Sequence, residues 1–335
     1  MKTQIAYSKD FNKHNNSGHP ENAQRLDVML NELKQTSFYN EIDFIEPRLL
    51  DEEILYSVHS GEMIQDIKDI SETGDSWLDL DTYVCKSDYE IARKAASGLL
   101  QICMNIIDDK IDNGFALIRP PGHHATRTRS MGFCLFNNAA ITANELAKQG
   151  KKVLIFDCDT HHGNGTQDIF YNRKDVLYQS FHLYPHFPGT GLINEIGKDD
   201  GKGYTINAPL CRGNGNKAIS NLLDEIFLPI SKQFNPDIII ISTGYDSHHS
   251  DLLGGLKLTS NFFGEIILEF QKIQPKIACT LEGGYNFNWI GKCFVSQIGQ
   301  LMSQPVKFKD NYDESFNFQS VIDEMKNELS SFWKI

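Results

Sequence analysis

The chain has 335 residues, of which 40% are hydrophobic and 23% charged, and its formal net charge is −12. These proportions are typical of globular proteins and exclude a disordered, collagen-like or coiled-coil chain. An acidic balance disfavours binding to a phosphate backbone, so we expect no direct nucleic-acid partner.

Cysteine usage and hydropathy bear on the compartment. The seven cysteines stand singly, without a Cys-x-x-Cys pair. Isolated cysteines in odd number disfavour a disulfide framework and predict a reducing compartment. Residues 1–16 lack the apolar core of a secretory signal. No apolar run approaches the roughly 18 residues that cross a bilayer. We therefore expect a cytoplasmic protein that does not interact with a membrane.

Short β-branched runs alternate with helical periodicity along the chain. Strands are predicted at residues 115–119, 152–159, 176–183, 237–246 and 276–281, with weaker candidates at 3–7 and 204–210. Helices are predicted at residues 21–35, 88–108, 137–149, 217–233, 259–273 and 320–333. Strands that are apolar on both faces are typical of a parallel sheet covered on both sides. The alternation predicts an α/β fold, and the lack of a linker predicts a single domain over residues 1–335.

Long turn-rich segments follow these strands. They cover residues 119–137, 160–168, 184–203, 243–256 and 282–288. In parallel α/β sheets, ligands bind at the carboxyl ends of the strands. We therefore expect these segments to meet at one edge of the sheet and to form the functional site.

The strongest local signal is Asp-Cys-Asp-Thr-His-His-Gly-Asn-Gly at residues 157–165, where a buried strand ends. Alternation places Asp157, Asp159 and His161 on one side of an extended backbone. Carboxylate and imidazole ligands suit zinc or ferrous iron. A bare Asp-x-Asp is often a solvated strand end, but the added histidines favour a metal site. His162, beside a ligand, is expected to pack against its neighbours.

Asp246, at the end of the run Ser-Thr-Gly-Tyr-Asp, offers a third ligand. Alone it could be an ordinary strand-end carboxylate. Together with Asp159 and His161 it leaves an open position for water or substrate, which is typical of a catalytic zinc site.

Two further motifs carry groups that can move or donate protons. His123 and His124 follow a stiff Pro-Pro-Gly turn. Paired loop histidines are usually inert, but beside a metal they could take a proton from water. Tyr285 follows paired glycines, and its hydroxyl could donate to a developing oxyanion. A tyrosine that only packs is the commoner case for such a motif.

The motifs together resemble the histone deacetylase family. In that family's order the chain has His-Pro-Glu at 19–21, Arg-Pro-Pro-Gly-His-His-Ala at 119–125, Gly-Phe-Cys at 132–134, the metal motif at 157–166, Phe-Pro-Gly-Thr-Gly at 187–191, Gly-Tyr-Asp at 244–246 and Leu-Glu-Gly-Gly-Tyr at 281–285. The forms of the first and fourth motifs resemble class II deacetylases and prokaryotic relatives, including acetylpolyamine amidohydrolases. The resemblance implies the arginase/deacetylase fold, a parallel sheet of about eight strands with helices on both faces.

The resemblance also implies roles for individual residues. Zinc would be held by Asp159, His161 and Asp246, with ferrous iron as an alternative metal. The proton-transfer pair would be His123 and His124. Asp157 would orient the first histidine, and Asn164 stands behind the second, where some relatives have an aspartate. An asparagine holds an imidazolium less strongly than a carboxylate does. Tyr285 would stabilise the transition state.

A narrow acyl-lysine tunnel is implied as well, with contributions from Gly132, Phe133, Phe187, Leu253 and, at the rim, Asp81. A structural potassium ion would be held by main-chain oxygens of Asp157, Asp159, His161, Ser180 and Phe181. Two positions depart from the pattern of relatives: Leu252 replaces a proline that follows Asp251, and His186 replaces an aromatic residue. His248 and His249 receive no role.

The function that these implications favour is zinc-dependent hydrolysis of an acyl-lysine in a protein or peptide. An acetylpolyamine amidohydrolase is the alternative, although Leu253 stands near the position of a glutamate in polyamine-selective relatives. A dimanganese ureohydrolase shares the fold but needs further ligands. A non-catalytic acyl-lysine reader is disfavoured because inactive relatives often lack the tyrosine, and Tyr285 is present.

Overall fold

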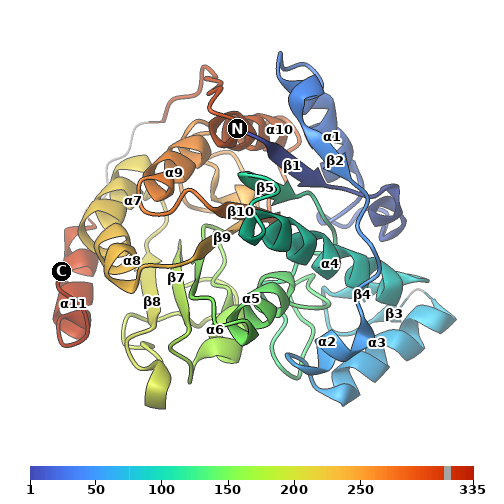
Figure 1. Cartoon of the computed structure of the whole chain (residues 1–335), viewed down its shortest axis with the longest axis horizontal. Coiled ribbons are helices and arrows are strands. Elements are labelled where there is room, and N and C mark those ends of the chain that lie inside the picture. Colours follow the sequence, from blue (N-terminus) through green and yellow to red (C-terminus); the bar gives the residue numbers. More distant parts are fainter. Residues whose placement is uncertain (75, 313–317) are drawn as a thin grey trace.

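One eight-stranded sheet forms the centre of the molecule, and all of its strands run parallel in the order β2-β1-β5-β10-β9-β6-β7-β8 (Figure 1). The computed structural model describes residues 1–74, 76–312 and 318–335. The strands are β1 (Thr3–Ala6), β2 (Asp43–Ile45), β5 (Asn113–Ala116), β6 (Val153–Asp157), β7 (Val176–Leu183), β8 (Thr205–Leu210), β9 (Ile238–Thr243) and β10 (Ile277–Leu281). The predicted α/β class with a parallel sheet of eight strands is confirmed.

Helices cover both faces of this sheet. They are α1 (Gln24–Leu33), α2 (Glu52–Tyr56), α3 (Gly61–Thr73), α4 (Asp88–Ile107), α5 (Asn138–Lys148), α6 (Asn164–Phe170), α7 (Asn216–Leu222), α8 (Leu228–Phe234), α9 (Phe262–Gln271), α10 (Ile290–Leu301) and α11 (Gln319–Leu329). In Figure 1, α4 and α5 lie on one side of the strands, and α9 and α10 lie on the other. A short antiparallel pair, β3 (Ser76–Trp77) and β4 (Tyr83–Val84), stands apart from the main sheet.

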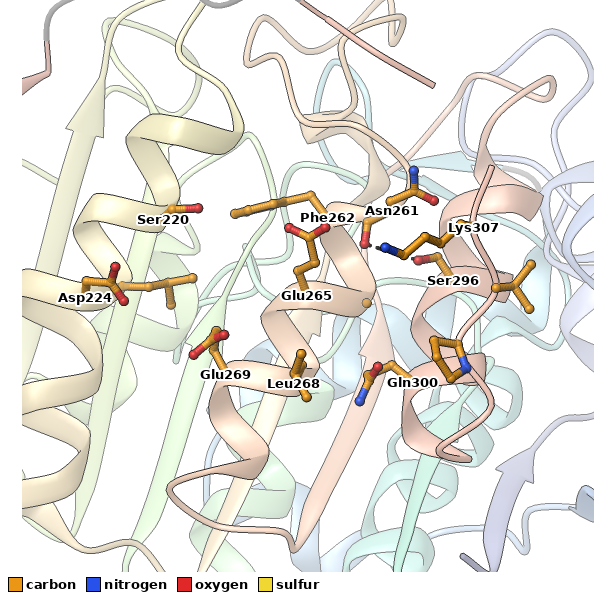
Figure 2. Close-up of a pocket in the computed structure, with 14 residues that line it drawn as sticks. Ser220, Asp224, Asn261, Phe262, Glu265, Leu268, Glu269, Ser296, Gln300 and Lys307 are labelled. Atoms are coloured by element: carbon orange, nitrogen blue, oxygen red, sulfur yellow. Dashed lines mark hydrogen bonds between the residues drawn. The ribbon is translucent and has the colours of Figure 1, made fainter. Parts of the chain in front are cut away.

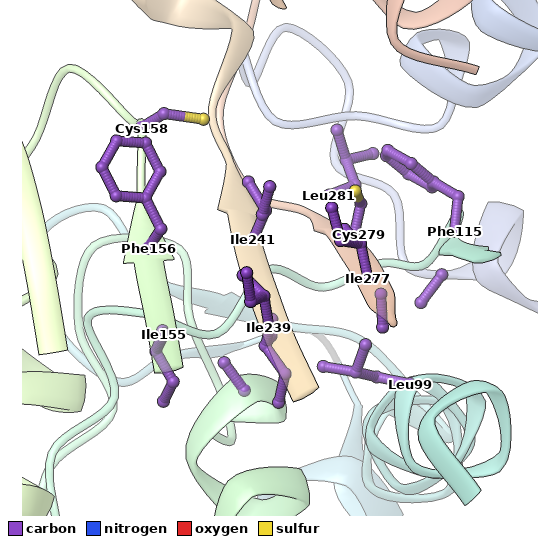
Figure 3. Packing of buried hydrophobic residues seen from close by; sticks show 14 of the residues in the cluster. Leu99, Phe115, Ile155, Phe156, Cys158, Ile239, Ile241, Ile277, Cys279 and Leu281 are labelled. Atoms are coloured by element: carbon purple, nitrogen blue, oxygen red, sulfur yellow. The ribbon is translucent and has the colours of Figure 1, made fainter. Parts of the chain in front are cut away.

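The central strands are buried on both faces. Ile238 to Ile241 of β9 are all fully inaccessible, and the neighbouring residues of β6 and β10 are equally buried. Figure 3 shows side chains of α4, β5, β6, β9 and β10 packed together around these isoleucines. Removing so much apolar surface from water supplies the main driving force for folding. The continuous apolar runs therefore belong to a doubly covered parallel sheet, as predicted.

Some elements differ from the sequence-based expectation. The predicted helix at 217–233 is α7, a π-helical turn (Leu223–Phe227) and α8. Pro229 lies in the first turn of α8, and its missing N–H interrupts the regular hydrogen-bond ladder. The predicted strand at 237–246 ends at Thr243, and the one at 152–159 ends at Asp157. In both, the chain leaves the sheet so that the following polar residues face the site.

Other elements were not predicted, namely β2, β3, β4, α2, α3, α6 and α10. Two glycines in α10 weaken its helical signal. A Cβ on Gly291 would lie 2.8 Å from Glu32 Cβ of α1, so this glycine allows α1 and α10 to pack closely. The strands β2, β3 and β4 have three residues or fewer, too few to show a periodic pattern.

The strand order places the chemistry-bearing segments side by side. β6 is paired with β9 and β7, and β9 is paired with β10, which in turn pairs with β5. The segments after β5, β6, β9 and β10 therefore leave the same edge of the sheet at neighbouring positions. Among the described residues, no helix has both the length and the apolar character needed to cross a membrane.

Candidate active site

The three predicted metal ligands come together at the carboxyl edge of the sheet. His161 Nδ1 lies 3.0 Å from Asp159 Oδ1 and 3.0 Å from Asp246 Oδ2. One ligand atom from each residue lies within 4.8 Å of the others. Two carboxylates converging on one imidazole nitrogen form a donor set that suits zinc and similar divalent cations.

Backbone groups and glycines hold this donor set in place. The N–H of Gly283 donates to Asp159 Oδ2 at 2.9 Å, and the N–H of Thr160 donates to Asp246 Oδ1 at 3.0 Å. A Cβ on Gly244 would lie 2.0 Å from Asp159 Oδ2, and one on Gly283 would lie 2.3 Å from Asp246 Oδ2. Any larger residue at these two positions would displace the carboxylates.

The site concentrates negative charge in a buried volume. Burial and the neighbouring Asp159 carboxylate raise the pKa of Asp246 to about 7. Burial opposes the protonation of His161, but hydrogen bonds and charge from Asp159 and Asp246 outweigh it and raise the pKa of His161 to about 10. A divalent cation would neutralise these carboxylates directly. The residues therefore fit a metal ion both in donor chemistry and in charge.

The histidine pair lies beside the ligands, and each ring has its own partner. His123 Nδ1 is 3.1 Å from Asp157 Oδ2, and the hydroxyl of Tyr178 donates to the same oxygen at 3.2 Å. His124 Nδ1 is 2.8 Å from Asn164 Oδ1. The centroids of the two imidazole rings are 4.0 Å apart. The predicted pairs of His123 with Asp157 and His124 with Asn164 are thus both in contact.

These partners drive the two histidines towards opposite protonation states. Burial opposes the protonation of His123, yet Asp157 and Asp159 outweigh it and raise its pKa to about 10. Burial, together with repulsion from His123 and His161, holds the pKa of His124 well below its usual range. An acceptor oxygen at Asn164 leaves the proton of neutral His124 on Nδ1, so Nε2 has a free lone pair. His124 is therefore suited to accept a proton, and His123 to carry a positive charge.

A cavity of about 220 Å³ opens onto these groups. It is lined by all five predicted tunnel residues, Asp81, Gly132, Phe133, Phe187 and Leu253, and by His123, His124, His161, Tyr285 and others. Gly132 has φ +56°, and a Cβ there would lie 2.5 Å from His124 Cδ2. The Phe187 ring stands edge-on to His124 with centroids 5.1 Å apart, and the Phe133 ring stands edge-on to Tyr285 at 6.0 Å. The aromatic walls and the histidine pair thus share one narrow space.

A second cavity, of about 450 Å³, is larger but offers less chemistry. It lies between α7, α9, α10 and residues 305–307, and Figure 2 shows the carboxylates of Asp224, Glu265 and Glu269 around it. Among the described residues that line it, there is no histidine or cysteine. The smaller cavity, with its ligand set and histidine pair, is therefore the candidate active site.

Glu282 is an important member of the site that received no role from the sequence. Its Oε2 accepts the N–H groups of Gly122 and His123 at 2.7 and 3.1 Å, and its Oε1 accepts the hydroxyl of Ser242 at 3.1 Å. Burial raises the pKa of this carboxyl to about 7. Glu282 thereby ties the end of β10 to the turn that carries the histidine pair. The sequence could have indicated a role for Glu282, because it directly follows a buried strand and lies in the Leu-Glu-Gly-Gly-Tyr motif at 281–285.

A buried ion network below the site also went without a role. Glu21 accepts hydrogen bonds from Arg25 at 3.0 Å and from Arg119 Nη2 at 2.6 Å. Arg25 also donates to the carbonyls of Glu282 and Gly284 at 2.6 and 2.7 Å. These contacts connect α1 and the end of β5 to the loop that carries Tyr285. Both Glu21 and Arg119 lie in motifs that the sequence had marked.

Three more residues can be placed. His162 turns away from the ligand set, with Nδ1 2.8 Å from Thr190 Oγ1 and Nε2 3.0 Å from Gln167 Oε1, so it is not a fourth ligand. His186 stacks on His161 with centroids 4.9 Å apart. Ser180 lies beside Asp157 in the register of β7 with β6 and is followed by Phe181. A potassium site there stays a prediction.

The arrangement is that of a metal-dependent hydrolase, with a divalent-cation donor set and a proton-transfer pair at the carboxyl edge of a parallel sheet. The chain belongs to the histone deacetylase family, because the histone deacetylase domain matches residues 19–301. The fold is accordingly the arginase/deacetylase fold, and the protein is a hydrolase of this family.

Individual relatives agree with this placement. The chain is 36% identical over 295 residues to a "Probable deacetylase" of Archaeoglobus fulgidus, covering 85% of this chain and 82% of the relative. It is 37% identical over 293 residues to "Histone deacetylase 15" of Arabidopsis thaliana, covering 85% of this chain and 53% of the relative. A crystal structure titled "HDA15 HD domain" superposes with a TM-score of 0.94 and 32% identity, covering 99% of this chain and 96% of that one.

His59 supports the loop behind the histidine pair and should make stability depend on pH. Its Nε2 accepts the N–H of Asn137 at 3.0 Å, and its Nδ1 lies 2.9 Å from the carbonyl of Thr126. Both contacts are satisfied by the neutral ring, and burial lowers the pKa of His59 to about 4. Between its unfolded pKa of about 6.5 and the folded value, the unfolded chain binds more protons, so acid favours unfolding.

We predict that His59 alone makes the protein about 2 kcal/mol less stable at pH 5 than at pH 7. Urea unfolding of the wild type and of His59→Gln at both pH values measures this effect as a difference between the two proteins, which cancels the contributions of other histidines. An equal loss of stability in both proteins would contradict the assignment.

Proposed function

We propose that the protein is a zinc-dependent amidohydrolase that removes acetyl or another short acyl group from acyl-lysine side chains. The observation that carries the proposal is the convergence of Asp159, His161 and Asp246 with the histidine pair and Tyr285 at one narrow cavity. Zinc would be held by the three ligands, and ferrous iron is the alternative metal. When bound, such an ion lowers the pKa of water and polarises the amide carbonyl.

The residues around the cavity can move the protons that hydrolysis requires. Neutral His124 can take a proton from water on Nε2 and pass it to the nitrogen of the leaving amine. His123, kept positive by Asp157, adds favourable charge beside the carbonyl as it becomes an oxyanion. Burial and the Asp246 carboxylate raise the pKa of Tyr285 far above its usual range, so its hydroxyl stays protonated and can donate to that oxyanion.

The shape and polarity of the cavity support an acyl-lysine substrate. Phe133 and Phe187 line a space that is mainly apolar. An unpaired ammonium loses much solvation energy in such a space, whereas a neutral acylated stem does not. The cavity therefore favours the acylated side chain over the free lysine that hydrolysis releases.

An acetylated polyamine is the second candidate substrate. The carboxylate of Asp81 lies at the cavity and could face the ammonium groups of a polyamine chain. Leu253, an apolar wall of the same cavity, argues for a peptide instead because it adds no charge.

A non-catalytic acyl-lysine reader is the remaining alternative. Such a protein would not need the proton-transfer pair or Tyr285, so their presence at the cavity argues against it.

Two further features complete the proposal. We place the protein in the cytoplasm because none of its seven cysteines, all within the described residues, forms a disulfide and six of them are buried, which is compatible with a reducing compartment. We also propose a structural potassium ion at main-chain oxygens of Asp157, Asp159, His161, Ser180 and Phe181. The paired positions of Asp157 and Ser180 on adjacent strands support it.

Loss of a ligand should abolish metal binding. We expect His161→Ala and Asp246→Ala to lose zinc, measured by elemental analysis of the purified proteins, because two remaining donors bind a divalent ion weakly. The matched control is His249→Ala, which alters a second histidine-aspartate cluster formed by His248, His249 and Asp310. Zinc retained by Asp246→Ala, or lost by His249→Ala, would show that the ion sits elsewhere.

Removing one proton donor should slow catalysis without releasing the metal. We expect Tyr285→Phe to lower kcat by roughly 100–1,000-fold, since that is the usual cost of deleting one oxyanion donor. His124→Ala should also lower kcat strongly while zinc is retained. Tyr204→Phe, distant from the cavity, serves as the control and should keep full activity. Wild-type turnover by both site variants would mean that the roles assigned to Tyr285 and His124 are wrong.

A turnover panel decides among the candidate functions. Formyl-, acetyl- and longer acyl-lysine peptides and acetylated polyamines are incubated with the zinc-loaded protein, and the released carboxylate is measured. We expect kcat/KM to be higher for short acyl-lysine peptides than for longer acyl-lysine peptides or acetylated polyamines, because the cavity is narrow and largely apolar. Faster turnover of acetylspermidine would favour the polyamine enzyme, and binding without hydrolysis of any substrate would favour the reader.

A further inference from the structure

The cluster of His248, His249 and Asp310 lies next to the loop of the third predicted ligand and has no part in the proposed chemistry. His248 Nε2 is 3.0 Å from Asp310 Oδ2, and His249 Nε2 is 2.8 Å from Asp310 Oδ1. Trp289 stacks on His248 at 4.8 Å, and Tyr312 stacks on His249 at 5.3 Å. The Asp310 carboxylate, which follows α10 in the chain, thus contacts two adjacent residues of the loop, His248 and His249.

The hydrogen bonds around His248 identify this cluster as a clamp and not as a metal site. The N–H of Ser250 donates to His248 Nδ1 at 3.2 Å, so that nitrogen acts as an acceptor. In the neutral ring the proton must then be on Nε2, where it is donated to Asp310. A metal ion would need the lone pair of that Nε2. Asp310 also accepts the N–H of Ser260 at 2.6 Å, which anchors it to the segment before α9.

Asp251, directly after the clamped residues, reaches from this loop to the loop of Tyr285. Its Oδ2 accepts the N–H groups of Tyr285 and Asn286 at 2.7 and 3.0 Å. Its Oδ1 accepts the N–H of Leu253 at 3.0 Å. The side chain of Asn286 returns a hydrogen bond to the carbonyl of Ser250 at 2.6 Å. A single, nearly buried carboxylate therefore holds both Tyr285 and the cavity wall at Leu253.

The loop of Tyr285 needs such an anchor. Tyr285 follows Gly283 and Gly284, and Gly284 has φ +115°, a conformation that residues with a Cβ rarely adopt. Two consecutive glycines also leave this backbone more freedom than other residues would. In the loop that carries Asp251, the next residue, Leu252, is 93% exposed and so adds little packing that could hold the loop. The hydrogen bonds of Asp251 therefore supply much of the restraint on this loop and on the loop of Tyr285.

We infer that Asp251 is a positioning residue that fixes the hydroxyl of Tyr285 in the cavity, with the Asp310 clamp holding the loop of Asp251 from its other side. This inference rests on the proposed function, because it assigns Tyr285 a role in the reaction. A hydroxyl that is misplaced by about 1 Å can lose most of its effect on rate. Asp251 itself does not touch the substrate.

A double-mutant cycle tests whether Asp251 acts through Tyr285. Asp251→Ala should lower kcat on an acetyl-lysine peptide by about tenfold or more, with KM and zinc content nearly unchanged. In a Tyr285→Phe background the same change should cost no more than about twofold, because the hydroxyl that it positions is already absent. Asp251→Asn keeps one acceptor oxygen and should give an intermediate kcat. The asparagine variant also serves if the alanine variant does not fold.

Controls and an activity-independent measurement make the outcome decisive. Asp237→Ala, which removes an acceptor for the N–H of Lys152 on the opposite edge of the sheet, should leave kcat unchanged. Equal losses from the Asp251 substitution in both backgrounds would overturn the inference. If the wild type hydrolyses no acylated substrate, the proposed function fails, and crystal structures of the Asp251 variants then decide. A displaced Tyr285 with undisturbed Asp159, His161 and Asp246 supports positioning, and an unmoved Tyr285 refutes it.

Discussion

The structure depends on a group of carboxylates buried together at the carboxyl edge of a parallel sheet. Asp157, Asp159, Asp246 and Glu282 are each at most 1% exposed. Like charges in a poorly solvated space repel strongly, and such a group persists only if each member has a compensating partner. Imidazoles and backbone N–H groups supply part of that compensation, and a divalent cation held by Asp159, His161 and Asp246 would supply more. The chemistry of the site is therefore a consequence of how the fold neutralises its own buried charge.

Positions in the sheet decide which carboxylate has which partner. Asp157 is still part of β6 and faces His123, whereas Asp159, two residues later, has left the strand and faces His161. The same separation gives the two cavity histidines opposite electrostatic surroundings. The pKa of His123 is raised to about 10 and that of His124 is held well below its usual range, so the first histidine is suited to stabilise negative charge and the second to accept a proton. The point at which the chain leaves the strand thus decides which histidine each aspartate contacts.

Local motifs predicted much of the site because the groups in each motif are close in sequence. The predicted metal ligands Asp159 and His161, the histidine pair and the glycines before Tyr285 were all visible as short patterns. Glu282, Tyr178 and Asp251 received no role, since their partners come from distant segments. The π-helical turn and the short strands were missed for a related reason, because packing and one proline outweigh weak local preferences there.

The amino-acid sequence by itself determined the fold class, the family and the residue types available for chemistry, because apolar periodicity and short motifs are local properties. Only the tertiary structure decided that Glu282 holds the turn of His123, that Asp251 reaches Tyr285, and that His248 and His249 share Asp310. Contacts of this kind join residues tens of positions apart. They depend on strand order and on the close approach of backbones, which no local pattern encodes.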